Sequence, residues 1–276
     1  MVFAYKMRMG RASIAQPIAI SSQLSNKLAN MSLLCAFLVV VIHCYVDSEH
    51  GSVFWWLTEF FGGGRFASGG LVRIAVPYFF VAAGFLLAGH MQQRDWWIKE
   101  CAKRVRSLVV PYIIWCGVFG LMILANKLLL HHEGFTLMDL RRIFGLGLGL
   151  RPYLIQCWFL RALFILVLIS PILKGGCGRC AVLILSAIVL FAGEFGFVWF
   201  RDDFWAVTFS LEGFFYFSVG VFLRYHPLRV SGMLARLGVA ALAIALLMAY
   251  ATLDYRHSSW AWHCRFAMIP AALASI

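Results

Sequence analysis

Charged side chains are scarce in this sequence. Asp, Glu, Lys and Arg make up 13% of its 276 residues, whereas hydrophobic residues make up 62%. Because a soluble domain carries about a quarter charged residues, this chain has too little polar surface to face water on every side. Its hydrophobic residues come instead in long continuous stretches, several of them near the roughly 20 residues that cross a bilayer as a helix.

These stretches also lack alternating polarity. The strands of a membrane barrel alternate in polarity over about ten residues, and the hydrophobic runs here do not. Because lipid offers no hydrogen bonds to the backbone, segments that span a membrane without such alternation must be helices. The sequence therefore predicts an all-α fold, a polytopic integral membrane helical bundle surrounded by the lipid bilayer.

Acidic residues are half as frequent as basic ones, 12 against 24, which leaves a net charge of +12. Such an excess can indicate a nucleic-acid-binding surface, but the basic residues lie in short segments between the hydrophobic stretches, like the cytoplasmic loops of membrane proteins. With the N-terminus in the cytoplasm, more than half of them fall on the inner side, together with only two acids, Asp95 and Glu100. We therefore expect a multi-pass protein of the plasma (inner) membrane with a cytoplasmic N-terminus and no nucleic-acid partner.

The hydrophobic stretches divide the chain into about eight spans, where the longest connecting loop covers residues 131–156. We expect residues 1–27 to form a basic cytoplasmic tail and residues 28–276 to form one membrane domain. The last stretch reaches the end of the sequence within a helix, so we expect this domain to be C-terminally incomplete. The predicted spans are about 28–46, 71–89, 108–130, 157–173, 181–200, 206–223, 233–253 and 266–276.

Common catalytic and metal-binding motifs are missing. The sequence has no GxSxG, HExxH or P-loop pattern. Cys177 and Cys180 form a single CxxC pair in a glycine-rich loop, without a second pair to complete a zinc site. His131 and His132 have no third ligand nearby. We therefore expect no metal and no bound cofactor.

His43 is the first candidate for chemistry, because it ends the hydrophobic run of the first predicted span. An ionisable group at membrane depth is costly and is usually functional. Imidazole titrates near neutral pH and can accept a proton from a hydroxyl group. Asp47 follows four residues later and would share a helix face with His43 if the helix continues, where a carboxylate could orient the ring. The alternative is an interfacial histidine that binds water at a helix end.

The second candidate is the basic run Lys103-Arg104-Val105-Arg106, which enters the third predicted span ahead of Pro111. Lys103 and Arg106 are three residues apart, a spacing that places them on one helix face. Two cations on one face could hold the phosphates of a nucleotide-bearing donor such as coenzyme A. The alternative is that these residues only reflect the positive charge of cytoplasmic loops.

Arg161 is the third candidate, because it lies within a hydrophobic span. A guanidinium at membrane depth needs a partner. Glu194 and Glu212 are the carboxylates that fall within predicted spans, and Glu212 is the partner we favour. The pair Arg161 and Glu212 could be a purely structural ion pair, or Arg161 could bind an anionic group of a substrate.

Five of these segments, taken in order, resemble the acyltransferase 3 family of membrane-bound acyltransferases. The first ends in a histidine, the third is a basic motif followed by proline and tyrosine, and the fourth carries the sequence WFLR. The match extends over most of residues 28–276. The five segments are residues 38–43, 73–87, 103–115, 157–171 and 211–220.

This resemblance implies transfer of an acyl group, usually acetyl, from cytoplasmic acyl-CoA to a sugar hydroxyl on a cell-envelope glycan, exopolysaccharide or lipid-linked saccharide. Acyl-CoA would be a co-substrate, and the saccharide would be the acceptor. His43 would be the catalytic base, and Lys103 with Arg106 would form the basic pair on the acyl-CoA side, with Arg104 between them. The resemblance also implies about ten membrane spans.

Two other functions stay open. One is a transporter or flippase for a saccharide or lipid, in which His43, Arg161 and Glu212 would line a polar pathway. The other is a catalytically inactive family member. The family pattern has a basic residue eleven positions before the histidine, and this chain has Ser32 there.

Overall fold

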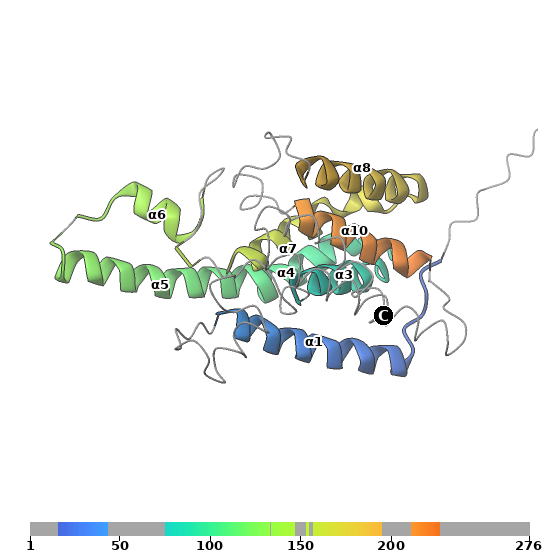
Figure 1. The fold of residues 1–276 in the computed structure, drawn as a ribbon, viewed down its shortest axis with the longest axis horizontal. Helices are drawn as coiled ribbons and strands as arrows, with labels where there is room; N and C mark the ends of the chain where they lie inside the picture. The colour runs from blue at the N-terminus through green and yellow to red at the C-terminus, as the bar shows by residue number, and fades with distance from the viewer. Residues whose placement is uncertain are drawn as a thin grey trace, which may run out of the picture.

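The computed structural model describes residues 16–43, 75–132, 134–146, 153–154, 157–194 and 211–226. Within these ranges the chain contains helices and no β-strand, so the predicted all-α class is confirmed for them. Figure 1 shows the helices gathered into a bundle from which α5 and α6 project along the long axis. The elements are α1 (Ser22–His43), α3 (Ala75–Ala88), α4 (Trp96–Arg104), the π-helical turn η2 (Val105–Val109), α5 (Val110–Leu129), α6 (Leu137–Ile143), α7 (Trp158–Ile169), the 3₁₀ turn η4 (Ser170–Leu173), α8 (Gly176–Glu194) and α10 (Leu211–Tyr225).

Helices α3 and α10 pack backbone to backbone because each presents a glycine to the other. A Cβ added at Gly84 would lie 3.2 Å from the backbone nitrogen of Val221 and would clash with the carbonyl oxygen of Phe217. A Cβ added at Gly220 would lie 2.9 Å from the backbone nitrogen of Phe85. Small residues at such contacts let two helices approach closely, as membrane helix pairs commonly do.

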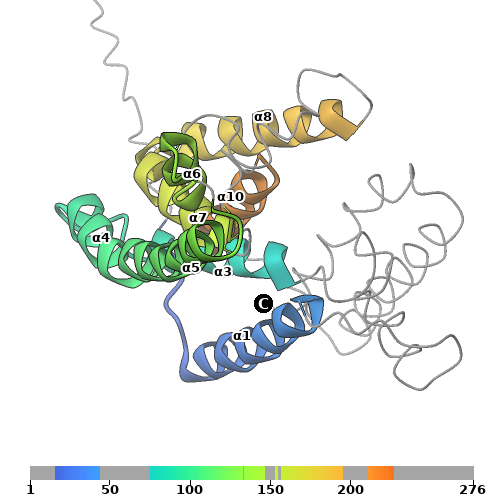
Figure 2. The same ribbon diagram turned by 90° about the vertical axis from the view of Figure 1, so that its left-hand side faces the viewer.

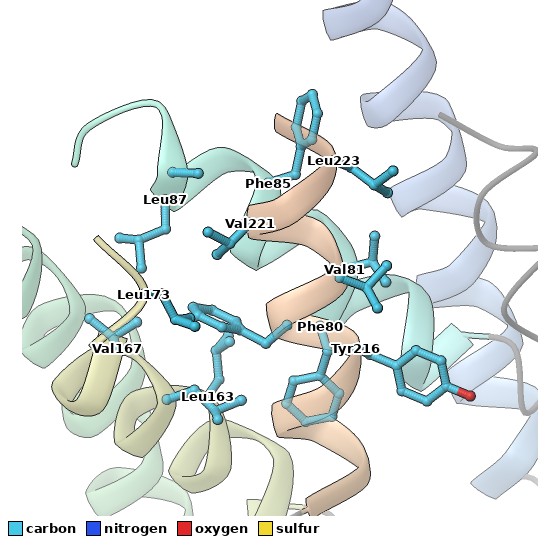
Figure 3. Packing of buried hydrophobic residues seen from close by; sticks show 14 of the residues in the cluster. Phe80, Val81, Phe85, Leu87, Leu163, Val167, Leu173, Tyr216, Val221 and Leu223 are labelled. Atoms are coloured by element: carbon cyan, nitrogen blue, oxygen red, sulfur yellow. The ribbon is translucent and has the colours of Figure 1, made fainter. Parts of the chain in front are cut away.

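A hydrophobic core surrounds the contact between α3 and α10 (Figure 3). Side chains from α3, α7 and α10 point toward one another there, and the ring of Phe80 lies 4.9 Å, centroid to centroid, from that of Phe159 on α7. Close packing of this kind stabilises helix association even where lipid replaces water. The largest fully buried members of the cluster are Phe80, Phe85, Leu87, Met91, Leu166, Leu173, Tyr216 and Phe217.

Helix α1 lies on the other side of α3 from α8 and α10 (Figure 2). It buries Cys35 and Leu38 in a small cluster with Ala75, Tyr78 and Ala82 of α3. The hydroxyl group of Tyr78 donates a hydrogen bond to the carbonyl oxygen of Leu28 (3.0 Å). The helix is therefore attached to α3 both by apolar packing and by a buried polar contact, and it begins earlier than the span predicted at about residue 28.

Three chain segments meet at one end of the bundle. The backbone nitrogen of Ile18 donates to the carbonyl oxygen of Arg224 (2.9 Å), so the chain just before α1 meets the last turn of α10. The hydroxyl group of Tyr225 donates to the carbonyl oxygen of Ala88 (3.3 Å), so α3 ends there as well. We call this place, where Ile18, Ala88 and Tyr225 meet, the junction end. Since α1 has 22 residues, His43 lies about 32 Å along the helix from Ser22.

The third predicted span is part of a longer helix. Elements α4, η2 and α5 form one continuous helix of 34 residues, Trp96–Leu129, which begins well before the span predicted at about residue 108. In its π-helical turn the backbone nitrogen of Val110 donates to the carbonyl oxygen of Val105. This turn ends two residues before Pro111, which has no backbone N–H and so disrupts regular α-helical bonding.

The loop predicted over residues 131–156 is wrong in one part, because it contains helix α6. Thr136 caps this helix: its hydroxyl oxygen accepts a hydrogen bond from the backbone nitrogen of Asp139 (3.2 Å), and the Asp139 carboxylate accepts one from the backbone nitrogen of Thr136 (2.9 Å). This reciprocal capping begins a helix where the hydrophobic pattern is too short to show one. Helix α6 folds back along α5, where Ile143 contacts Gly120.

Among the described residues, two helices are long and apolar enough to cross a membrane. They are residues 22–40 of α1 and the continuous helix Trp96–Leu129. The apolar helices at 75–88, 158–173 and 178–188 lie at predicted spans but are shorter. The predicted spans 233–253 and 266–276 lie outside the described residues, so the count of about eight spans stays a prediction.

The glycine contact gives the first testable prediction. Gly84→Ala or Gly220→Ala should destabilise the protein by about 1–3 kcal/mol or more, because the added methyl group meets backbone atoms that cannot rotate away. Gly117→Ala is the matched control. It places the same methyl group in a helix with no atom within 4 Å, where alanine should be favourable by about 0.5–1 kcal/mol. Thermal unfolding in detergent measures all three, and equal stability of the Gly84 and Gly117 variants would contradict the close contact.

Candidate functional site

The described part of α1 ends at His43, so the position of this residue at a helix end stays a prediction. The side chain of His43 and all of Asp47 lie outside the described residues. Ser32 precedes His43 by eleven residues, which is about three helical turns, so the two positions share a face of α1. At Ser32 this face meets α3, where the hydroxyl oxygens of Ser32 and Tyr78 are 3.5 Å apart. Ser32, at the position of the family's basic residue, thus takes part in packing between α1 and α3.

The basic run occupies the end of α4 and the π-helical turn. The side chain of Lys103 is 63% exposed, and Arg106 is exposed as well. The wider bonding pattern of a π-helical turn rotates the chain less per residue than an α-helix does. The two cations therefore diverge more than their three-residue spacing predicts for a regular helix, although both stay accessible to a ligand.

Arg104 differs from its two neighbours because it turns toward Glu100, whose side chain is only 9% exposed. The Nε atom of Arg104 lies 3.7 Å from the Glu100 carboxylate, and Lys103 Nζ lies 4.0 Å from it. His90 Nδ1, from the turn after α3, lies 3.3 Å from the same carboxylate. Glu100 thus joins the turn after α3 to the basic run. The Glu100–Arg104 spacing of four residues is the sequence signal for this contact.

Arg161 holds the turn that follows α6. Its Nη1 atom donates to the carbonyl oxygen of Gly145 (2.8 Å), and the neighbouring carbonyl of Phe144 accepts a hydrogen bond from the Tyr112 hydroxyl group (2.8 Å). Gly145 has φ 55°, a left-handed conformation that favours glycine. The side chains of Glu194 and Glu212 lie outside the described residues, so the pairing of Arg161 with Glu212 stays a prediction.

Asp139 attaches α6 to the end of α5. Its carboxylate accepts hydrogen bonds from the Thr136 hydroxyl group (2.7 Å), from Lys127 Nζ (2.9 Å) and from the Tyr153 hydroxyl group (3.0 Å). These contacts, led by Thr136, hold the pKa of Asp139 well below its usual range. Because the folded-state pKa is depressed, this contribution to stability is present above the unfolded pKa of about 3.9 and is lost as the pH falls through the folded value.

No group of three His, Cys, Asp or Glu side chains in the described part of the chain could hold a metal ion. Cys180 of the CxxC pair is an exposed free thiol in the first turns of α8. The described polar groups therefore suit binding of anions and orientation of loops, and they provide no metal centre.

The comparison with protein families identifies the class of protein. A family model described as an acyltransferase domain matches residues 30–276, nearly the whole chain. The chain therefore belongs to the acyltransferase 3 family, and the resemblance noted in five of its segments is confirmed. No curated protein and no solved structure matches the chain.

The attachment of α6 gives the second prediction. Asp139→Asn should lower hydrogen-exchange protection over residues 137–146 by about tenfold or more, because it weakens the hydrogen bonds that the charged carboxylate accepts from Lys127 and Thr136. Asp95→Asn is the control, since that carboxylate is 65% exposed and its ion-pair partner among the described residues is the neighbouring Arg94. Unchanged protection in Asp139→Asn would show that apolar packing alone holds α6 on α5.

Proposed function

We propose that this protein is an integral membrane O-acyltransferase, which moves an acyl group, usually acetyl, from acyl-CoA to a sugar hydroxyl. The match of the acyltransferase domain over residues 30–276 carries this proposal, because it includes His43 and the whole basic run. The acceptor that fits the resemblance is a cell-envelope glycan, an exopolysaccharide or a lipid-linked saccharide. The roles proposed below for His43, Lys103 and Arg106 are the ones that the same resemblance implies.

A membrane location is supported by exposed apolar faces on several helices. Large hydrophobic side chains are more than half exposed on α1, α5 and α8, including Leu33 (74%), Leu121 (67%) and Leu185 (61%). A soluble monomer rarely exposes apolar surface over several helices at once. Lipid covers such faces without cost. The N-terminus then lies in the cytoplasm, as the charge distribution predicts.

His43 acts as the general base in the proposed reaction. Its neutral imidazole accepts the proton of the sugar hydroxyl while the hydroxyl oxygen attacks the thioester carbonyl carbon. The new C–O bond forms, the C–S bond breaks, and the departing thiolate takes a proton back from the imidazolium. Asp47 orients the ring and stabilises its charged form. Assistance of this kind accelerates a reaction by about 10²–10⁴-fold.

Lys103 and Arg106 bind phosphate oxygens of the donor in this proposal. Both side chains are exposed, and Arg104 is held by Glu100 beside them. Figure 1 shows α1 ending and α5 beginning at similar levels along the long axis. The pantetheine arm of a donor bound at the basic run would then extend toward His43, and transfer through an acyl-histidine intermediate is the alternative route.

The third prediction tests the base. His43→Ala and His43→Gln should each lower acyl transfer by about 10²-fold or more, because neither side chain can accept the proton. Asp47→Asn should cost less, since it changes only the orientation and basicity of the ring. The measurement is transfer of labelled acetyl groups to glycan in membranes that carry each variant at the same level.

His131→Gln is the matched control, because His131 is an exposed histidine just beyond α5. It should retain full activity. Full activity of His43→Gln, at normal expression, would remove the base from the mechanism and would favour a transport function instead.

A further inference from the structure

Two arginines at the junction end are buried without an acidic partner among the described residues. Arg179, in the first turn of α8, is 4% exposed, and Arg224, in the last turn of α10, is 7% exposed. The Nε atom of Arg179 and the Nε and Nη1 atoms of Arg224 are buried and have no hydrogen-bond partner within the described ranges. A buried charge without a partner is strongly unfavourable, so these groups require an anion.

The described carboxylates cannot supply that anion. Glu100 and Asp139 already contact other cations, and Asp95 lies in the exposed turn before α4 beside Arg94. Glu194 and Glu212 belong to the same helices as the two arginines, but they lie fifteen and twelve residues away. Those separations correspond to about 22 Å and 18 Å along a helix, so the backbones of Glu194 and Glu212 lie at the opposite ends of α8 and α10 from the two arginines.

Stacking contacts hold the faces of both guanidinium groups, while buried N–H groups at their edges have no hydrogen-bond partner in the described part of the chain. Arg179 Cζ lies 3.8 Å from the centroid of the Tyr225 ring, and Arg224 Cζ lies 4.8 Å from that of Phe85. A ring covers only the face of a guanidinium, whereas its N–H donors point outward in the plane. This edge matches the oxygen spacing of a phosphate group. The two side chains are thus oriented in advance for bidentate contacts.

Both arginines lie beside the C-terminal end of α3. The Tyr225 hydroxyl group, at the far end of the ring beneath Arg179, donates to the carbonyl oxygen of Ala88. A Cβ at Gly89 would lie 3.0 Å from Arg224 Nη2, so the glycine leaves room beside that guanidinium. Arg179 Nη1 donates to the carbonyl oxygen of Lys174 (3.0 Å). That contact ties the arginine to the end of η4 but leaves its Nε unpaired.

We propose that Arg179 and Arg224 form a phosphate-binding site between α3, α8 and α10, which takes a phosphate group of the acyl-CoA donor. The assignment to the donor rests on the proposed function. Coenzyme A carries a diphosphate and a separate 3′-phosphate, so it needs more than one cationic position. Lys103 and Arg106 bind one of these groups, and the junction end binds the other. The charge distribution of the sequence places all four residues on the cytoplasmic side, where acyl-CoA is found.

The test is coenzyme A binding to the full chain in nanodiscs of neutral phosphatidylcholine, measured by isothermal titration. Arg224→Gln and Arg179→Gln should each weaken binding by about ten- to hundredfold, because each removes charge-assisted hydrogen bonds. Arg224→Lys should lie between Arg224→Gln and the unchanged protein, since it keeps the charge but loses the bidentate edge. Arg94→Gln is the matched control, because that side chain is 95% exposed, and it should change affinity by less than about twofold.

Thermal unfolding without ligand separates binding from folding. Arg224→Gln should unfold at the same temperature as the unchanged protein or higher, because it removes an unpaired buried charge, and it should lose the stabilisation by coenzyme A. If Arg224→Gln does not fold, Arg224 has a partner within the protein that the fold requires. The proposal then fails for that residue. In that case the coenzyme A affinity of Arg179→Gln decides whether the site binds phosphate. Equal affinity in Arg179→Gln, Arg224→Gln and Arg94→Gln would overturn the proposal.

Two further measurements distinguish the possible sources of the phosphate. If the variants lose bound phosphatidylglycerol in anionic nanodiscs but keep their affinity for coenzyme A, the site binds a lipid headgroup and the donor assignment is wrong. If the unchanged protein binds coenzyme A through these arginines but transfers no acyl group, the proposed function fails while the phosphate site stands.

Discussion

The contact between Gly84 and Gly220 is the constraint on which the rest of the bundle depends. It brings the backbones of α3 and α10 together, and only residues without a Cβ permit that distance. Because the two helices run in the same direction, their last turns meet, and Tyr225 bonds to Ala88. The junction end is a direct result: α10 brings Arg224 to it, α8 brings Arg179, and the chain before α1 closes it at Ile18.

The continuous helix Trp96–Leu129 connects the two parts of the proposed mechanism, donor binding and acyl transfer at His43. Its first part carries the basic run beside Glu100, which His90 links to the end of α3. The π-helical turn before Pro111 changes the direction of side chains between Lys103 and Arg106 without breaking the helix. A donor held at both cationic positions would therefore lie along the bundle, with its acyl group directed toward the His43 end.

Much of this architecture was predictable from the sequence, because hydrophobic runs and scarce charge directly reflect the lipid environment. The all-α class, the family and a first apolar helix that contains His43 follow from such patterns. Capping residues can indicate a helix that hydrophobic periodicity misses. The pair Thr136 and Asp139 does so, since it begins α6 inside a predicted loop. The roles of Arg179 and Arg224 were not predictable. A basic residue at a helix end has the same sequence pattern whether it faces solvent or is buried, and only packing between distant helices distinguishes the two.

The most direct test of this account is photolabelling of the full chain with an acyl-CoA analogue that carries a photoreactive group on its adenine ring. The account predicts labelled peptides that contain Ala88, Arg179 or Arg224, and their labelling should disappear when unmodified coenzyme A is in excess. Label confined to the projecting end formed by α5 and α6, near Leu129 and Leu137, would contradict the account. So would labelling at the junction end that excess coenzyme A does not reduce.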